Sequence, residues 1–293
     1  MRNFKIWLLL PILALASALA ACRFALNIPS PALPQMKTIP VQTDTIQVPA
    51  PAQQPAGLEL DFAAGKLTLS PGGGSLLVDG TATYNLAELK PEVIQEGRRT
   101  VIRHRQDGLS GIPPFSRDLQ NTWDLKLGTM PIDLVVKSGA DTSSMELGGL
   151  ALHSLEVTSG ASRSRISFSQ PNPERMEELR IESGASTVDL QGLGNANFRD
   201  LVLRGGAGQY TLDFSGALKD EAHVRIETGV SKVNLLIPSG MNAHVAFNGA
   251  LSNIHTTGGW QQEGEEYVLS GSGPTVWITL SMGAGDVELR ELK

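Results

Sequence analysis

The sequence predicts an all-β chain in which short repeats stack into a single-domain β-solenoid with coils of about 22 residues. Apolar and polar residues alternate over much of the chain, as expected for strands, whose successive side chains point to opposite faces. No long segment with helical periodicity competes with this pattern, and the best helical candidate, residues 173–178, is predicted to be a single loop turn. A central glycine recurs at intervals of 21, 24, 22 and 23 residues, at Gly139, Gly160, Gly184, Gly206 and Gly229.

Residues 1–21 are predicted to be a lipoprotein signal peptide. A positively charged start is followed by an apolar run shorter than the ~20 residues that span a bilayer, and by small residues before a cleavage site. Leu19-Ala20-Ala21-Cys22 resembles the lipobox of bacterial lipoproteins. That resemblance implies cleavage before Cys22, diacylglycerol on its sulfur and often a further acyl group such as palmitate. The alternative is an ordinary signal peptide with an incidental cysteine.

Cys22 is the only cysteine, which excludes a disulfide-stapled scaffold and cysteine-based metal sites. With two or three acyl chains on Cys22, the membrane becomes a stable partner and the expected location is the bacterial cell envelope, outside the cytoplasm. Cleavage removes Arg2 and Lys5, so the net charge of −6 becomes −8, with 22 basic and 30 acidic residues. An acidic chain without a basic block is not expected to bind nucleic acid, and it gains no attraction from an anionic membrane surface.

Residues 22–56 are predicted to be the lipidated cysteine followed by a proline-rich disordered linker. Residues 23–56 hold 7 of the 17 prolines, each of which fixes φ and removes a backbone donor. Such a segment spans roughly 30 Å as a coil and roughly 105 Å as polyproline II. It serves either as an inert spacer or as a proline-rich ligand for a partner domain.

Residues 57–130 are predicted to form an N-terminal β subdomain. A first copy of the repeat, centred on Gly65, opens it, and residues 70–130 then interrupt the pattern. The stretch Arg98–Arg105 concentrates four arginines and His104. This stretch either contacts an anionic envelope polymer or protein, or is a solvated strand face that balances an acidic body.

Residues 131–293 are predicted to be the repeat β-solenoid. A single repeat buries too few apolar side chains to offset the entropy of ordering it, so neighbouring repeats must share hydrogen bonds and core. If the coils stack in parallel, Glu182, Arg204 and Glu227 alternate in sign along one face, and Glu156 faces Arg180. The small residue before each central glycine suits a tight corner, although a serine-lined site is the alternative; these residues are Ser138, Ser159, Ser183, Gly205 and Thr228.

Several segments of the chain resemble the toast-rack family: residues 123–127, 131–134, 190–198 and 212–216, and the Gly-Ala-Ser copies. The resemblance covers about residues 57–293, and the family includes the C-terminal domain of bacterial proteins in the cell-wall-active antibiotic response and surface adhesins with similar repeats. It implies an all-β stack resembling a right-handed β-helix, a role at the cell envelope and no catalytic residues. Those antibiotic-response relatives often carry transmembrane helices ahead of the domain, whereas this chain carries a lipoprotein signal, so a membrane-sensor mechanism does not carry over.

The sequence yields no catalytic, cofactor-binding or metal-binding set. The histidines share no metal-binding spacing; they are His104, His153, His223, His244 and His255. There is no nucleophile elbow, the Gly-rich turn at residues 70–74 lacks the lysine and helix of a phosphate-binding loop, and no Asp-x-Asp-x-Asp-Gly pattern indicates calcium. One carboxylate cluster could serve a β-helical carbohydrate-active enzyme: Glu174, Glu177, Glu178 and Glu182, with Asp189 and Asp213.

The predicted function is therefore a non-enzymatic surface lipoprotein of the cell envelope, adhesin-like or a scaffold, that binds an envelope protein or glycan. Two alternatives remain at this point. One is the β-helical carbohydrate-active enzyme, and the other is a regulator of the cell-envelope stress response, which only the family resemblance suggests.

Overall fold

The structure is a computed structural model that describes residues 38–105 and 119–293, except the side chains of residues 250–252. The described residues belong to one compact unit, Lys37–Lys293. They form a single sheet of 15 strands with two very short helices, which confirms the predicted all-β solenoid class. The predicted signal peptide and Cys22 lie outside the described residues.

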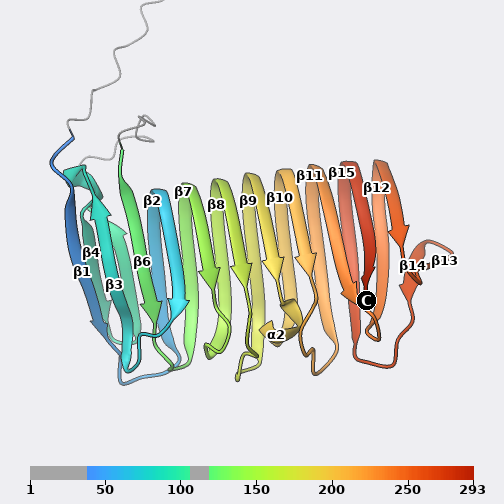
Figure 1. Cartoon of the computed structure of the whole chain (residues 1–293), viewed down its shortest axis with the longest axis horizontal. Coiled ribbons are helices and arrows are strands. Elements are labelled where there is room, and N and C mark those ends of the chain that lie inside the picture. Colours follow the sequence, from blue (N-terminus) through green and yellow to red (C-terminus); the bar gives the residue numbers. More distant parts are fainter. Residues whose placement is uncertain (1–37, 106–118) are drawn as a thin grey trace, which may run out of the picture. The chain divides into compact units, whose positions relative to one another are not determined.

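The strands follow one another along the sheet in the order β1-β3-β6-β2-β7-β8-β9-β10-β11-β15-β12-β14-β13, and β5 pairs with both β2 and β4 (Figure 1). The helices are η2 (Ala87–Leu89) and α2 (Leu193–Ala196). The strands are β1 (Gln42–Pro49), β2 (Ala56–Pro71), β3 (Leu76–Tyr84), β4 (Pro91–Glu96), β5 (Arg99–His104), β6 (Asn121–Leu127), β7 (Ile132–Glu146), β8 (Leu152–Ser167), β9 (Met176–Gln191), β10 (Phe198–Asp213), β11 (Ala222–Pro238), β12 (Asn242–Thr257), β13 (Gln261–Glu263), β14 (Glu266–Leu269) and β15 (Thr275–Leu292).

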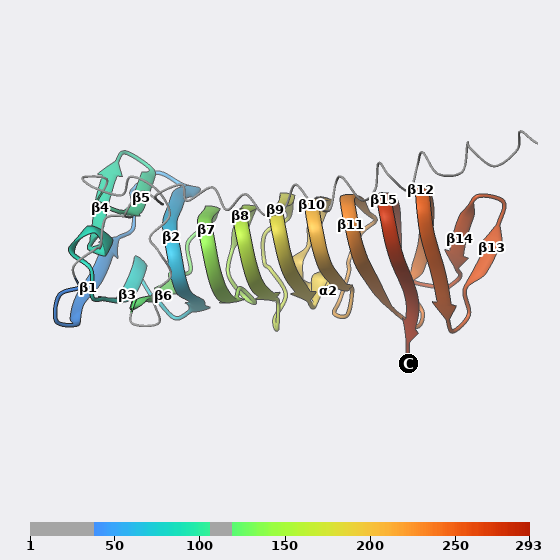
Figure 2. The ribbon, with the colours of Figure 1, turned by 90° about the horizontal axis from the view of Figure 1, so that it is seen from above.

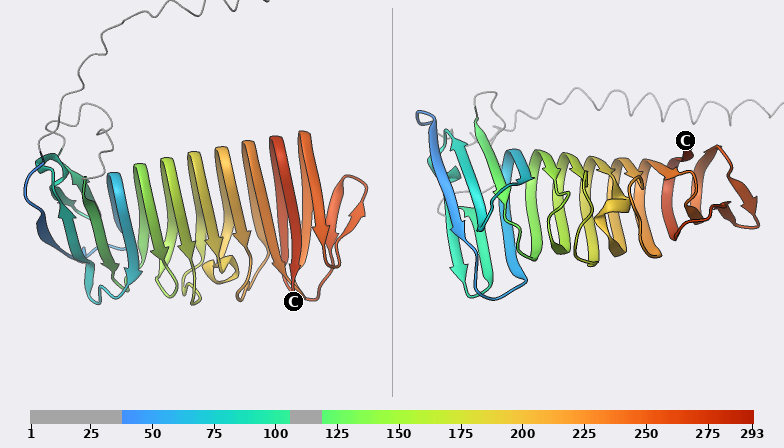
Figure 3. Two further views of the ribbon diagram at one scale, coloured as in Figure 1. Left: turned by 45° about the horizontal axis from the view of Figure 1, so that its top comes forward. Right: turned by 60° about the horizontal axis from the view of Figure 1, so that its bottom comes forward.

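The long strands β7 to β11 are the repeating coils. Each bends midway, and each pairs in parallel with the next along almost its whole length; Figures 2 and 3 show the same row from other directions. Loops connect successive coils at the edge opposite the bend (Figure 1). Register partners, such as Leu179 with Leu201, lie 21, 24, 22 and 23 residues apart on successive coils.

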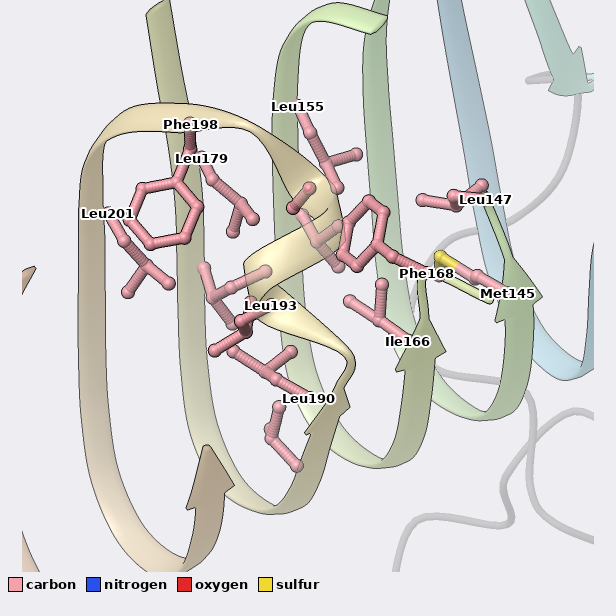
Figure 4. Close-up of a cluster of buried hydrophobic side chains, with 14 of the residues drawn as sticks. Met145, Leu147, Leu155, Ile166, Phe168, Leu179, Leu190, Leu193, Phe198 and Leu201 are labelled. Atoms are coloured by element: carbon pink, nitrogen blue, oxygen red, sulfur yellow. The ribbon is translucent and has the colours of Figure 1, made fainter. Parts of the chain in front are cut away.

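The core lies between the two halves of each bent strand. Leu155, Leu179 and Leu201 point inward before the bend and Ile166 and Leu190 point inward after it, all at most 1% exposed (Figure 4). The loop edge is closed by larger side chains, including Phe168, Leu193 of α2 and Phe198 (Figure 4). The alternation in the sequence is therefore the alternation between core and solvent.

The helical turn lies elsewhere than predicted. Residues 171–175 form a loop and β9 already begins at Met176, whereas the turn of helix is α2, between Gly192 (φ 69°) and Asn197 (φ 54°). The reason is burial: Leu193 and Ala196 fill the loop edge of the core, and Met176 enters the sheet opposite Phe198.

The central glycines stack on one another at the bend. A Cβ added to Gly184 would lie 2.4 Å from the carbonyl oxygen of Gly160, and one added to Gly206 would lie 2.6 Å from that of Gly184. Contacts of the same kind join Gly139, Gly160, Gly229 and Gly283 to the preceding coils. None of these glycines has positive φ, so close approach of neighbouring backbones, and not left-handed backbone, is what requires glycine here.

Hydroxyl groups line the inside of the same corner. Ser162 contacts Ser186 on the next coil at 3.1 Å, Ser164 contacts Ser162 at 3.1 Å, and Ser143 contacts Ser164 at 2.9 Å. In the coil where Gly205 replaces serine, the hydroxyl of Tyr210 occupies the space and lies 3.2 Å from Ser183. The row before the central glycines is engaged in the same corner: Ser138 donates to Asp141 at 2.6 Å, Ser159 contacts Ser162 at 2.9 Å, and Thr228 accepts from Ser231 at 2.8 Å. These hydroxyls are hydrogen-bonded within the stack, which supports the tight-corner interpretation of the serine row over a serine-lined site.

The proline-rich segment is not linker throughout. β1 pairs antiparallel with β3, and Ile46 and Val48 are at most 3% exposed. The prediction of an unpacked linker up to residue 56 is therefore wrong for residues 42–49. This stretch contains no proline before Pro49 and alternates polar and apolar residues, so it can complete a sheet edge.

Two separate strands close the N-terminal end of the stack. Along β2, the half before its bend pairs with β5 and the half after it pairs with β6, both in parallel. Where β5 ends and β6 begins, His104, Phe62 and Trp123 pack together, with ring centroids 4.9–5.7 Å apart. The Nδ1–H of His104 donates to the carbonyl of Leu89 at 2.9 Å, and Nε2 accepts from the amide of Asn121 at 3.3 Å, so the ring is neutral.

At the other end, the order of strands in space departs from the order in the chain. The C-terminal β15 lies between β11 and β12, and β14 pairs with β12 only over Ala243–Ala246. All inward side chains of β15 from Val276 to Leu289 are apolar and buried, whereas Ile254 of β12 is only partly buried. The strand with the complete apolar pattern thus takes the position that is covered on both sides, and the weaker repeat takes the end.

The corner predicts an asymmetry between two glycines. Gly184→Ala places a methyl group against the Gly160 carbonyl, and we expect it to lower the free energy of unfolding by about 1–3 kcal/mol. Gly57→Ala is the matched control, because its Cβ meets nothing closer than 3.7 Å, and we expect a change of at most about 0.5 kcal/mol. Urea titration measures both, and equal effects would contradict the stacking argument.

His104 predicts a pH dependence of stability. Burial lowers the pKa of His104 to about 4 from 6.5, although the hydrogen bond to the Leu89 carbonyl acts in the opposite direction. In the unfolded chain His104 therefore becomes protonated below about pH 6.5, whereas in the folded chain it stays neutral down to about pH 4. We expect the free energy of unfolding to fall across this window by about 3 kcal/mol.

Urea titrations at several pH values test this assignment. His104→Gln removes the titrating group, so its stability should fall less between pH 6.5 and pH 4 than that of the wild type. His153→Gln changes an exposed histidine and should follow the wild-type curve. A His104→Gln curve parallel to that of the wild type would refute the assignment.

Candidate functional site: the outer face before the corner

The outward side chains that precede the glycine corner form a continuous surface over β7 to β12, here called the pre-corner face. Three rows run across it, because parallel register places equivalent residues side by side. The row nearest the corner is Lys137, Thr158, Glu182, Arg204, Glu227, Ser281 and Asn248. The middle row is Val135, Glu156, Arg180, Val202, Arg225, Thr279 and Ala246. The outermost row is Asp133, Ser154, Glu178, Asp200, His223, Trp277 and His244.

Charges in the row nearest the corner pair across strands, as the sequence predicts. Arg204 lies between two carboxylates, 3.2 Å from Glu182 on β9 and 3.2 Å from Glu227 on β11. All three side chains are exposed enough that each pair contributes only about 0–1 kcal/mol. The row is thus neutralised locally and fixes the register weakly.

In the middle row the two residues expected to be neighbours are adjacent, but the arginine forms its ion pairs with other carboxylates. Glu156 and Arg180 are register partners, as predicted. Arg180, however, contacts carboxylates on its own strand, Glu178 at 2.6 Å and Glu182 at 3.6 Å. Residues two apart on a strand point to the same face, so Glu178 and Glu182 both lie within reach of Arg180 on its own strand. Its register partner on β8, Glu156, offers only one carboxylate.

Two hollows open on this face and share Arg204. One, about 540 Å³, lies over the row nearest the corner and is lined by the ion pairs of Glu182, Arg204 and Glu227. The other, about 510 Å³, spans β9 to β11 and β15 and is lined by Arg180, Asp200, His223, Arg225 and Trp277 among others.

Trp277 is the exposed aromatic side chain of the described residues. Its side chain is 41% exposed, whereas its chain neighbours Val276 and Ile278 are buried. The indole stacks on the imidazole of His244, with ring centroids 4.3 Å apart and planes 24° apart, and His223 is its register partner on the other side. Sequence reasoning missed this residue, although its outward position between two inward residues of the alternation could have revealed it.

The basic stretch Arg98–Arg105 is largely engaged within the molecule. Arg98 contacts Asp133 at 3.0 Å, Arg99 contacts Glu59 at 2.7 Å, and Arg103 contacts Glu92 at 3.3 Å. Hydrogen bonds from Lys137 and Arg99 lower the pKa of Glu59. His104, in the same stretch, is buried. The stretch therefore behaves as a strand face whose arginines balance nearby carboxylates.

The carboxylates considered for an enzyme do not converge. Glu178 and Glu182 lie on the pre-corner face, whereas Asp189 and Asp213 follow the corner and point out of the opposite half of the coil. Arginines contact four of the six: Glu177, Glu178, Glu182 and Asp189. Among the described residues no group of three or more histidines, aspartates or glutamates is arranged to hold a metal ion.

Comparison with known proteins gives the family. The family model described as the N-terminal domain of toast_rack, DUF2154, matches residues 37–178 and 172–236, which together cover more than half of the chain. This chain belongs to the toast-rack family. No curated protein matches this toast-rack chain significantly in sequence.

A solved structure shares the fold of this toast-rack protein. A "putative cell adhesion protein" from Clostridium sporogenes superposes with a TM-score of 0.53 at 17% identity, covering 86% of this chain and 100% of that one. A "putative adhesin" from Parabacteroides distasonis gives a TM-score of 0.39 at 10% identity, covering 86% and 97%. A "putative adhesin" from Bacteroides fragilis gives 0.36 at 10% identity, covering 85% and 96%, and scores this low add nothing to the fold assignment.

The described part of this toast-rack protein contains no helix long and apolar enough to cross a membrane.

Proposed function

We propose that this protein is a non-enzymatic, adhesin-like lipoprotein of the bacterial cell envelope, anchored through Cys22, that presents its pre-corner face to a partner. The toast-rack fold shared with a "putative cell adhesion protein" supports the adhesin-like role. The lipobox-like segment Leu19–Cys22 supports the anchor.

The observation that carries the binding role is the regular pre-corner face itself. Register repeats outward side chains across seven strands, from β7 to β11 and on to β15 and β12, so the surface extends along the stack. Arginines contact Glu178, Glu182 and Glu227 on this face, an arrangement that suits recognition better than glycoside hydrolysis, which requires one protonated and one ionised carboxyl group flanking the scissile bond.

The anchor predicts a clear fractionation result. The full chain expressed in bacteria should incorporate an alkyne-labelled palmitate and sediment with membranes. Cys22→Ser should abolish the label and shift most of the protein out of the membrane fraction, whereas Ser30→Ala should behave like the wild type. Membrane recovery and label unchanged by Cys22→Ser would overturn the anchor.

The adhesive role predicts saturable binding by the anchored protein. Liposomes carrying the full lipidated chain should bind isolated bacterial envelopes or extracellular matrix coated on a surface, with a plateau at high liposome concentration. Liposomes carrying an unrelated lipoprotein of similar net charge are the control. Equal, non-saturating binding by both kinds of liposome on every surface would refute the proposed function.

A further inference from the structure

The hollow beside Trp277 combines three arginines with an exposed aromatic side chain, on the surface of a chain with net negative charge. The outermost row of its lining comes from four consecutive strands, β9, β10, β11 and β15, and runs Glu178, Asp200, His223 and Trp277 in register. The hollow measures about 510 Å³, large enough for a small ligand and too small for a folded partner.

Trp277 offers a rigid apolar plane to whatever enters the hollow. Stacking on His244 holds one face of the indole in place, and Nδ1 of His244 lies 3.6 Å from a carboxylate oxygen of Glu266 on β14. An immobilised aromatic ring binds flat apolar surfaces at little cost in side-chain entropy. The faces of pyranose rings, where several C–H groups point the same way, are such surfaces.

Arg225 is the available cation of this hollow. Glu178 holds Arg180, Arg199 holds Asp200, and Arg204 is held by two glutamates, whereas Arg225 forms no ion pair with any described residue. Its register partners, Val202 and Thr279, carry no charge. Arg225 is exposed and lies two residues from His223, the register partner of Trp277, and its guanidinium donates no hydrogen bond to another described side chain.

We propose that this hollow binds an acidic saccharide, with the ring of one sugar stacked on Trp277 and its carboxylate paired with Arg225. The proposal rests on the proposed function and names the ligand class. Charge complementarity favours an anionic group, and a single exposed aromatic surrounded by polar side chains favours a sugar. A protein partner would need a larger apolar centre, but the other exposed large hydrophobics, Val41, Val93 and Val230, are not among the lining residues.

Calorimetric titration of the full lipidated chain in detergent micelles tests the proposal. The probes are short oligouronates (oligogalacturonate, oligoglucuronate and oligomannuronate), each paired with its methyl ester, which removes the charge and keeps the ring. We expect at least one oligouronate to bind, and its methyl ester to bind about tenfold or more weaker.

Variants separate the two contacts. Trp277→Ala should weaken binding of acid and ester alike by about tenfold or more, with Trp277→Phe retaining part of the affinity. Arg225→Gln should remove the preference for the acid over the ester. Arg163→Gln, an exposed arginine on the outer face beyond the corner, and Val230→Ala, an exposed apolar side chain at the corner, should change nothing.

The outcomes distinguish this inference from the proposed function. If no oligouronate binds, or if Trp277→Ala binds like the wild type while its melting temperature is unchanged, the saccharide site is refuted. Liposome adhesion that persists in the Trp277→Ala chain would then leave the adhesin-like role standing with another ligand. If the liposomes adhere to no surface and no oligouronate binds in the calorimetric titrations, both the saccharide site and the adhesin-like role are refuted.

Discussion

The whole stack depends on how closely two backbones approach at the corner. Neighbouring strands of a sheet lie about 4.8 Å apart, and at the bend the carbonyl of one coil points into the space where the next coil's Cβ would lie. Glycine therefore occupies this position in β7 to β11 and in β15, whereas β2, which begins the row of bent strands, has Ala63 there. Because a shift of one residue would exchange core and solvent faces throughout a strand, that single steric constraint, together with the alternating pattern, locks the register of every side chain on either side of it.

The two ends of the stack need a different structure from the repeating coils, because a terminal coil would expose both its core and an unpaired strand edge. The N-terminal end replaces a bent coil by two strands, β5 and β6, and fills the missing corner with Phe62, His104 and Trp123. The C-terminal end instead reorders the chain: β15 enters the stack before β12, and β14 covers only part of β12. Both ends use antiparallel pairs, which need only short loops.

The structure of the repeating coils could be predicted from the sequence, whereas the structure of the two ends of the stack could not. Alternation and glycine spacing are local properties that recur with each coil, so the corner, the inward rows and the pairing of Arg204 with Glu182 and Glu227 follow from them. The insertion of β15 ahead of β12 and the addition of β1 depend on comparing the apolar completeness of distant segments. Proline content also misled, because it averaged residues 42–48, which contain no proline, with the proline-rich residues around them.

The candidate site illustrates the same limit at the level of single side chains. Arg225 and Trp277 are 52 residues apart, and no local pattern connects them; the insertion of β15 beside β11 brings them into one hollow. Had β12 followed β11 directly, Arg225 would face Ala246, and the row of Asp200 and His223 would continue into His244 without the exposed indole of Trp277. The reordering that completes the core therefore also creates the exposed Trp277–Arg225 pair, so stability of the C-terminal end and chemistry of the hollow depend on the same strand.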